Sequence, residues 1–182
     1  MQEKQEFLQN WITSLDDYEL PDWEALPKLD LYMDQVITLM EEYLRIYQTP
    51  KDKLITPSMI NNYVKLGVIP KPAKKRYSRI HLAYLTMVCS LKQVLSISVI
   101  QKMLPLTMSE QEVAQAYRSF KDAQKQIFSQ TAEQVSSSLA EMYQKENATF
   151  SEVSAFSVRV ALTGNIHKIL SEIIADQIKI SF

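Results

Sequence analysis

Apolar residues recur at helical spacing along most of the chain and predict a series of amphipathic helices. Between residues 16 and 30 the pattern is broken by acidic residues and two prolines, which indicates an irregular connector. The two longest segments differ: one has a single apolar stripe, whereas the other is apolar almost all round. The predicted helices cover residues 3–15, 31–48, 58–66, 79–93, 97–104, 109–147 and 151–180.

The composition favours helices over sheets. Only 2 of the 182 residues are glycine, and glutamate, glutamine, lysine, leucine, methionine and alanine are abundant. These side chains lose little rotamer freedom in a helix, so we expect an all-α or nearly all-α fold. The single cysteine, Cys89, lies in an apolar run, where its expected role is that of a small buried hydrophobe.

The last apolar segment, residues 151–180, allows two environments. A helix that is apolar on several faces is buried, either at the centre of this chain's own bundle or in a dimer interface. Gly164 in its interior costs about 1 kcal/mol relative to alanine. We therefore expect a tight helix crossing there, with His167 as a hydrogen-bonded core histidine.

Residues 55–79 carry the clearest local signals. Thr56, Pro57 and Ser58 supply a hydroxyl cap and a proline in the first turn, where the missing N–H of proline would be unpaired anyway. Gly67 follows the last periodic residue and suits a left-handed cap at the end of the helix. A short helix at residues 56–66 with this surface has the size of a DNA recognition helix. The polar side chains that we expect it to expose are Asn61, Asn62 and Lys65.

A basic loop follows this helix. Pro70 and Pro72 bias their preceding residues away from the helical region, so residues 71–77 are predicted to form a stiff, extended wing. Ser78 then caps the next helix, and Ser96 or Ser98 caps the one after it. His81 lies one turn into the first of these helices and is expected at the surface or at a hinge.

The charge is distributed in blocks. Residues 1–50 hold 3 basic and 11 acidic side chains, residues 51–102 hold 10 basic and 1 acidic, and residues 103–182 hold 7 basic and 9 acidic. The central basic block creates a positive field that a polyanion commonly exploits. A solvated basic face, balanced by the acidic first fifty residues, is the alternative.

The order of these features resembles the winged-helix DNA-binding domain of MerR-type transcription regulators over about residues 35–105. The shared features are a capped helix, Leu-Gly-Val-Ile-Pro, a basic wing, Tyr-Ser and two further helices. In this resemblance Tyr63, Lys65 and Gly67 match the second tyrosine, the basic residue and the terminal glycine of the family helix. Asn61 and Asn62 stand where the family has its DNA-contacting arginine and its first tyrosine. The whole chain also resembles a family of Gram-positive bacteria known as a domain of unknown function.

We therefore predict a sequence-specific transcription regulator that binds double-stranded DNA. Residues 56–66 would enter the major groove, where asparagine can pair with adenine, and the wing would contact phosphates. Tyr63 and Tyr77 serve equally well as aromatics at the edge of the core. The predicted DNA-binding residues are Thr56, Ser58, Asn61, Asn62, Tyr63, Lys65, Lys71, Lys74, Lys75, Arg76, Tyr77 and Arg79.

A second hypothesis is a non-catalytic helical module for protein interaction. Its basic segment would bind an acidic partner, for example the acidic first fifty residues of the same chain. A related possibility is autoinhibition, in which this acidic segment covers the basic block.

No signature of catalysis is present, and we expect no enzyme activity, no cofactor and no metal site. The two glycines are 97 positions apart, and the sequence has one cysteine and two histidines, too few for a metal cluster. No apolar run is long enough to span a membrane, and no signal peptide is recognisable, so a cytoplasmic location is expected. The sequence does not identify a small-molecule effector.

Three segments are expected along the chain. Residues 1–30 form an acidic helix and connector, residues 31–105 the winged-helix domain, and residues 106–182 a helical region for dimerisation or effector binding. Symmetric dimers are common among proteins that read palindromic DNA sites, so we favour a homodimer through the C-terminal helices.

Overall fold

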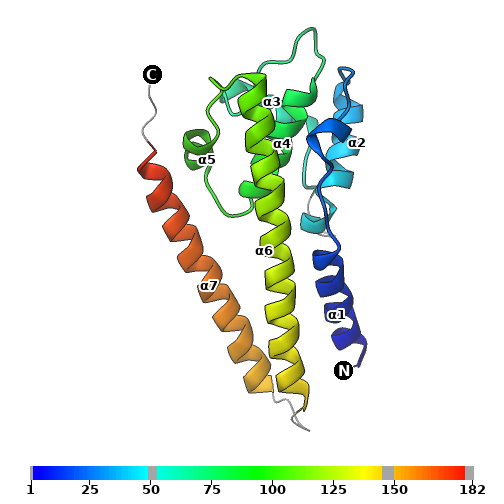
Figure 1. The fold of residues 1–182 in the computed structure, drawn as a ribbon, viewed down its shortest axis with the longest axis vertical. Helices are drawn as coiled ribbons and strands as arrows, with labels where there is room; N and C mark the ends of the chain where they lie inside the picture. The colour runs from blue at the N-terminus through cyan, green and yellow to red at the C-terminus, as the bar shows by residue number, and fades with distance from the viewer. Residues whose placement is uncertain (1, 49–52, 145–149, 179–182) are drawn as a thin grey trace. The chain divides into compact units, whose positions relative to one another are not determined.

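The computed structural model describes residues 2–48, 53–144 and 150–178 (Figure 1). Helices make up 72% of the chain, and the described part has no strands, which confirms the predicted all-α fold. The α-helices are α1 (Gln2–Asp16), α2 (Met33–Tyr43), α3 (Pro57–Lys65), α4 (Arg79–Leu91), α5 (Ile97–Met103), α6 (Glu110–Gln144) and α7 (Phe150–Asp176). Two short 3-10 helices, η1 (Trp23–Ala25) and η2 (Arg45–Tyr47), lie before and after α2.

Helices α3, α4 and α5 begin directly after hydroxyl residues that the sequence predicts as caps. The Thr56 hydroxyl accepts a hydrogen bond from the Met59 N–H at the start of α3, and Ser96 accepts one from Val99 at the start of α5. Ser78 precedes α4 as its cap. The Thr56 and Ser96 hydroxyls each satisfy a backbone donor that has no partner inside the helix.

The chain forms two compact units. Unit 1 comprises residues 1–19 and 123–171, and unit 2 comprises residues 20–122 and 172–182. The connector after α1 and the first part of α6 therefore belong to the same unit as residues 31–105.

Helix α4 lies at the centre of the core of unit 2. All residues from His81 to Ser90 are buried, and Cys89 is among them, as predicted. The expectation that His81 lies at the surface or a hinge is wrong, because only 7% of this residue is exposed. Residues of α2, α3, α5 and α6 complete the core, including Val36, Met40, Ile60, Ile100 and Tyr117.

In unit 1, α1 packs against α6. Ile12 and Leu15 are buried on α1, and Tyr18, which follows the helix, is also buried, with its ring 5.6 Å from that of Phe128 on α6. Glu19 forms an ion pair with Lys125 at 3.2 Å between Oε1 and Nζ. The single apolar stripe predicted for residues 109–147 includes Ile127, which is exposed, but most of its other positions are covered.

Helix α7 is mostly exposed. From Val153 to Leu170 the one residue of α7 that is even partly covered is Phe156, and most of the others are small or apolar. Of the two environments expected for residues 151–180, burial at the centre of the chain's own bundle does not agree with this exposure. The tight crossing expected at Gly164 is also absent, since no described atom lies within 4 Å of a Cβ built there, and His167 is exposed.

No helix in the described part of the chain is long and apolar enough to cross a membrane.

Candidate nucleic-acid interface

Helix α3 is fixed at both ends by local interactions. Thr56 caps its start, and its end has the paired hydrogen bonds of a Schellman motif: Val68 N–H to the Tyr63 carbonyl at 2.8 Å and Gly67 N–H to the Val64 carbonyl at 3.1 Å. Gly67 has a φ of +66°, the left-handed conformation that this motif requires. The Gln101 side chain of α5 donates a further hydrogen bond to the Leu66 carbonyl at 2.7 Å.

The two faces of α3 have different roles. Ile60 and Tyr63 are buried against the core, and burial raises the pKa of the Tyr63 hydroxyl to about 12. Tyr63 is only 4% exposed, so it is a core residue and cannot present its ring to DNA, contrary to its prediction as a contact. The opposite face exposes Ser58, Asn61, Asn62, Lys65 and Leu66.

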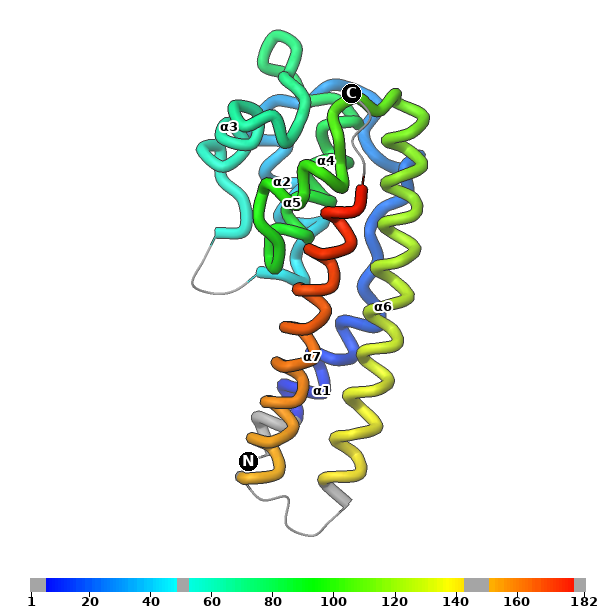
Figure 2. Tube along the Cα trace, turned by 90° about the vertical axis from the view of Figure 1, so that its left-hand side faces the viewer, coloured from blue at the N-terminus to red at the C-terminus, as the bar shows by residue number. Residues whose placement is uncertain are grey.

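Residues 70–77 form a narrow hairpin-like wing that projects from unit 2 (Figure 2). At its base, Leu31 and Tyr77 exchange two backbone hydrogen bonds, each 2.9 Å long. At its tip, Ala73 pairs with Arg76 across Lys74 and Lys75. Both lysines have positive φ, 49° and 62°, as in the tight two-residue turns whose twist suits a hairpin.

Arg76 is held in place by an aromatic residue from a distant part of the chain. Its guanidinium lies 4.5 Å from the centre of the Tyr32 ring, and Nη2 donates a hydrogen bond to the Tyr32 hydroxyl at 2.6 Å. The side chain remains exposed. A cation over an aromatic face at an exposed site contributes about 0.5–1 kcal/mol, so this contact stiffens the wing beside its tip.

The base of the wing contains a buried histidine. Nδ1 of His81 accepts a hydrogen bond from the Ser78 N–H at 3.0 Å, and the imidazole packs edge-on against the Tyr77 ring at 5.5 Å. Burial lowers the pKa of His81, although the Lys71 carbonyl and Asp30 act in the opposite direction. Tyr77 is only 3% exposed, so it anchors the wing and is not available as the predicted DNA contact.

Arg79 also has a structural role. Its Nη2 donates a hydrogen bond to the Leu26 carbonyl at 2.9 Å, and its guanidinium lies over the Trp23 ring at 5.4 Å. This half-buried side chain ties α4 to the connector before α2, so its prediction as a DNA contact does not fit its position.

The remaining predicted residues are polar, and all but one of them are exposed on unit 2. Thr56 is half-buried as the helix cap, and the others are exposed. Sequence reasoning missed Leu31, Tyr32 and His81, which position the wing; a Ser-x-x-His spacing was the one local signal for His81. The exposed set is Ser58, Asn61, Asn62, Lys65, Lys71, Lys74, Lys75 and Arg76.

The acidic connector pairs with α6. Within unit 2, Asp22 and Glu24 form ion pairs with Lys121 and Arg118, and the Tyr117 hydroxyl donates a hydrogen bond to the Pro21 carbonyl at 2.9 Å. The Arg118 hydrogen bond lowers the pKa of Glu24. These acidic side chains thus neutralise α6 instead of the basic block of residues 51–102.

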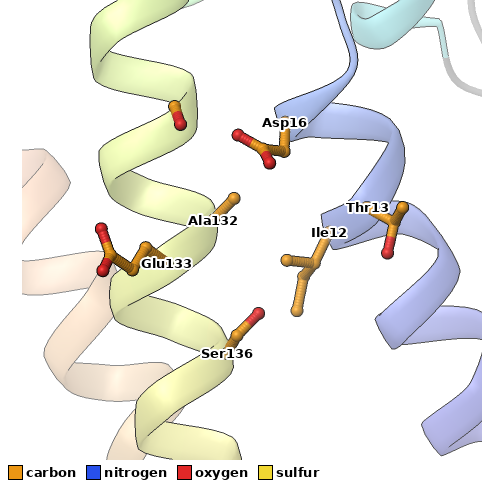
Figure 3. Close-up of a pocket in the computed structure, with 7 residues that line it drawn as sticks. Ile12, Thr13, Asp16, Ala132, Glu133 and Ser136 are labelled. Atoms are coloured by element: carbon orange, nitrogen blue, oxygen red, sulfur yellow. The ribbon is translucent and has the colours of Figure 1, made fainter.

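A separate pocket of about 310 Å³ lies in unit 1 between α1 and α6 (Figure 3). Asp16 lines it from α1 and Glu133 from α6, and in Figure 3 the Glu133 carboxylate points away from Asp16. The other lining residues are two apolar ones, Ile12 and Ala132, and three that carry hydroxyls, Thr13, Ser129 and Ser136. It contains none of the predicted site residues, and its carboxylates have no neighbouring histidine or cysteine among the lining residues. Over residues 2–48, 53–144 and 150–178, no group of three or more histidine, cysteine, aspartate or glutamate residues could hold a metal ion.

Comparison with known proteins gives one family match. Residues 21–120 match the model of a family described as "Domain of unknown function (DUF1836)". No curated protein and no solved structure matches the chain significantly. The matched residues include α2 to α5, the wing and the start of α6, and thus all of the exposed predicted residues.

Proposed function

The chain belongs to the DUF1836 family, whose description states no function, and we propose that it is a non-catalytic transcription regulator that reads double-stranded DNA in the manner of MerR-type winged-helix proteins. One observation carries the proposal: the polar face of α3 and the lysine tip of the wing are both exposed and are held by the same core. This combination suits binding of α3 in a DNA groove while the wing contacts the phosphates beside that groove.

Helix α3 would supply the base contacts. Asn61 and Asn62 are exposed on the face that carries Lys65, and an asparagine amide can form two hydrogen bonds with adenine in the major groove. Leu66, also exposed, can contact a thymine methyl group. The fixed ends of α3 support this role, because a reader helix must keep its register while it lies in the groove.

The wing would supply phosphate contacts. Lys74 and Lys75 lie at the turn and are exposed, and the pairing of Leu31 with Tyr77 limits the freedom of the loop that carries them. A lysine on a preformed hairpin loses less conformational freedom on binding than one on a mobile loop. Phosphate contacts of this kind orient a protein on DNA without selecting a sequence.

The test is selection from random duplexes with the purified chain near physiological salt. We expect an enriched motif that contains adenine at conserved positions, and that is lost in an Asn61→Ala, Asn62→Ala variant that still binds bulk duplex. Replacing Lys74 and Lys75 by glutamine should instead lower the slope of log affinity against log salt by about 1.8, because about 0.9 is lost per phosphate contact.

Lys92→Gln is the matched control, because this exposed lysine lies at the opposite end of α4 from the wing. It should leave both motif and salt slope unchanged. If the parent chain enriches no sequence and the wing variant binds duplex as weakly as the parent, the proposal is wrong. The basic surface would then be examined as a docking site for an acidic protein partner.

A further inference from the structure

An exposed tyrosine and an exposed arginine are joined beside the tip of the wing. The Tyr32 hydroxyl accepts the hydrogen bond that Arg76 Nη2 donates at 2.6 Å, and the guanidinium lies 4.5 Å from the centre of the Tyr32 ring. Tyr32 is nevertheless 50% exposed, and Arg76 is also exposed. The contact therefore orients both polar groups without covering them.

Both residues of this Tyr32–Arg76 pair lie on backbone that is fixed by hydrogen bonds. The Tyr32 N–H donates to Oε1 of Gln35 at 2.9 Å, and the Arg76 N–H donates to the Ala73 carbonyl at 2.9 Å. Their neighbours in sequence exchange the two backbone hydrogen bonds at the base of the wing. A ligand that binds the pair would meet groups already in position, which lowers the entropy lost on binding.

The pair keeps donors that this contact does not use. A guanidinium has five N–H donors, of which one is directed to Tyr32, and a phenol that accepts a hydrogen bond keeps its own proton to donate. Across residues 2–48, 53–144 and 150–178, no carboxylate forms an ion pair with Arg76. Adjacent donors with an uncompensated positive charge suit an oxyanion that offers more than one acceptor oxygen.

We propose that the Tyr32 hydroxyl and the Arg76 guanidinium together bind one phosphodiester group of the DNA backbone. The inference rests on the proposed function and adds Tyr32, which the sequence did not predict, to its contacts. The planar fork of arginine matches two oxygens of a phosphate, and the hydroxyl can donate to one of them. Because Tyr32 precedes α2 and Arg76 lies in the wing, this phosphate would be held by two separate parts of unit 2.

The test is the affinity of the parent chain and Tyr32→Phe for one duplex of mixed sequence. Phenylalanine keeps the ring beside the guanidinium and removes the hydroxyl alone. We expect the affinity to fall about 5- to 10-fold, because a hydrogen bond to a charged group is lost. Between about 50 and 200 mM salt the slope of log affinity against log salt should not change, since no charge is removed.

Arg76→Gln separates a shared contact from a positioning role for Tyr32. This substitution alone should lower the salt slope by about 0.9, the amount expected for one phosphate contact. Adding Tyr32→Phe to Arg76→Gln should weaken binding by a further factor of about 2 or more, because the hydroxyl contacts the phosphate itself. If the hydroxyl served only to orient Arg76, the second substitution would have no effect.

Tyr47→Phe is the matched control, because the whole of α2 lies between Tyr32 and Tyr47 in the chain. It removes a hydroxyl from the same unit and should bind the duplex as the parent does. Equal melting temperatures of the parent, Tyr32→Phe and Tyr47→Phe would show that a change in affinity does not come from unfolding.

The inference is overturned if Tyr32→Phe binds the duplex as tightly as the parent, or if its effect disappears in the Arg76→Gln background. It is also overturned, in favour of a site for free phosphate, if replacing chloride by inorganic phosphate at equal ionic strength weakens duplex binding by the parent but not by Tyr32→Phe. A parent chain that binds the duplex but enriches no motif counts against the proposed function alone. A parent chain that binds no duplex overturns both.

Discussion

Helices α4 and α7 are both apolar around most of their circumference, yet their surroundings in the folded chain are opposite. All side chains from His81 to Ser90 on α4 are buried, whereas most large apolar side chains of α7 are exposed. Each helix carries one of the two histidines, and each unit one of the two glycines. An apolar circumference therefore does not by itself show that a helix is buried within its own chain.

The largest expected difference between these helices is the cost of truncating a leucine. Leu82 on α4 is 0% exposed and Leu162 on α7 is 62% exposed. Leu82→Ala should lower the free energy of unfolding by about 2–5 kcal/mol through a core cavity. At submicromolar concentration Leu162→Ala should change it by less than about 0.5 kcal/mol. Urea unfolding followed by circular dichroism measures both.

Protein concentration sharpens this test. If α7 is covered by a second copy, the cost of Leu162→Ala should increase as the concentration is raised, while that of Leu82→Ala stays constant. Equal costs for the two variants at low concentration would contradict the described burial of α4 and exposure of α7.

The two glycines should respond to alanine in opposite directions. Gly67 has a φ of +66°, so Gly67→Ala should destabilise unit 2 by about 1–2 kcal/mol through backbone strain alone, since no atom of the described residues lies within 4 Å of the added Cβ. Gly164 lies inside α7 with the same free space, so Gly164→Ala should stabilise the monomeric helix by up to about 1 kcal/mol. Thermal unfolding at low concentration measures the two shifts.

A destabilising effect of Gly164→Ala that appears only at high concentration would sharpen the comparison further. It would place Gly164 in a contact between two α7 helices, because the methyl group of the new alanine would push the two backbones apart. Destabilisation at every concentration would instead show that α7 is packed within its own chain.

The parts of this fold that sequence reasoning predicted depend on local signals. The start and end of α3 follow from Thr56, Pro57 and Gly67, which act within a few residues of their own positions. The polar face of α3 follows from the same periodicity that predicts its buried side. Cys89 was assigned correctly because its neighbours in sequence are also its neighbours in the core.

The parts that could not be predicted depend on contacts between distant residues or on positions without a sequence signal. The contact of Tyr32 with Arg76 joins residues 44 positions apart. The turn at Lys74 and Lys75 has no glycine or asparagine, the residues that usually mark positive φ. For Tyr63 and Tyr77 the sequence is equally consistent with a core position and a DNA contact, and only tertiary packing decides between the two.

The smallest expected difference concerns the two histidines. Burial lowers the pKa of His81 from its ordinary value of 6.5, so the unfolded chain binds the proton more readily than the folded one. Stability from this residue is complete above pH 6.5 and is lost as the pH falls below it. Protonation also removes the Nδ1 lone pair that accepts the hydrogen bond from Ser78 N–H at the base of the wing.

The measurement is the melting temperature between pH 7.5 and pH 5 for the parent chain, His81→Gln and His167→Gln. Glutamine at the third position of a helix can accept the same hydrogen bond from the cap residue without gaining charge, so His81→Gln should lose less stability on acidification. His167 is exposed, so His167→Gln is the matched control for loss of a histidine at the surface. Parallel profiles for all three proteins would mean that His81 is protonated as easily in the folded chain as in the unfolded one, and that its burial does not couple the wing to pH.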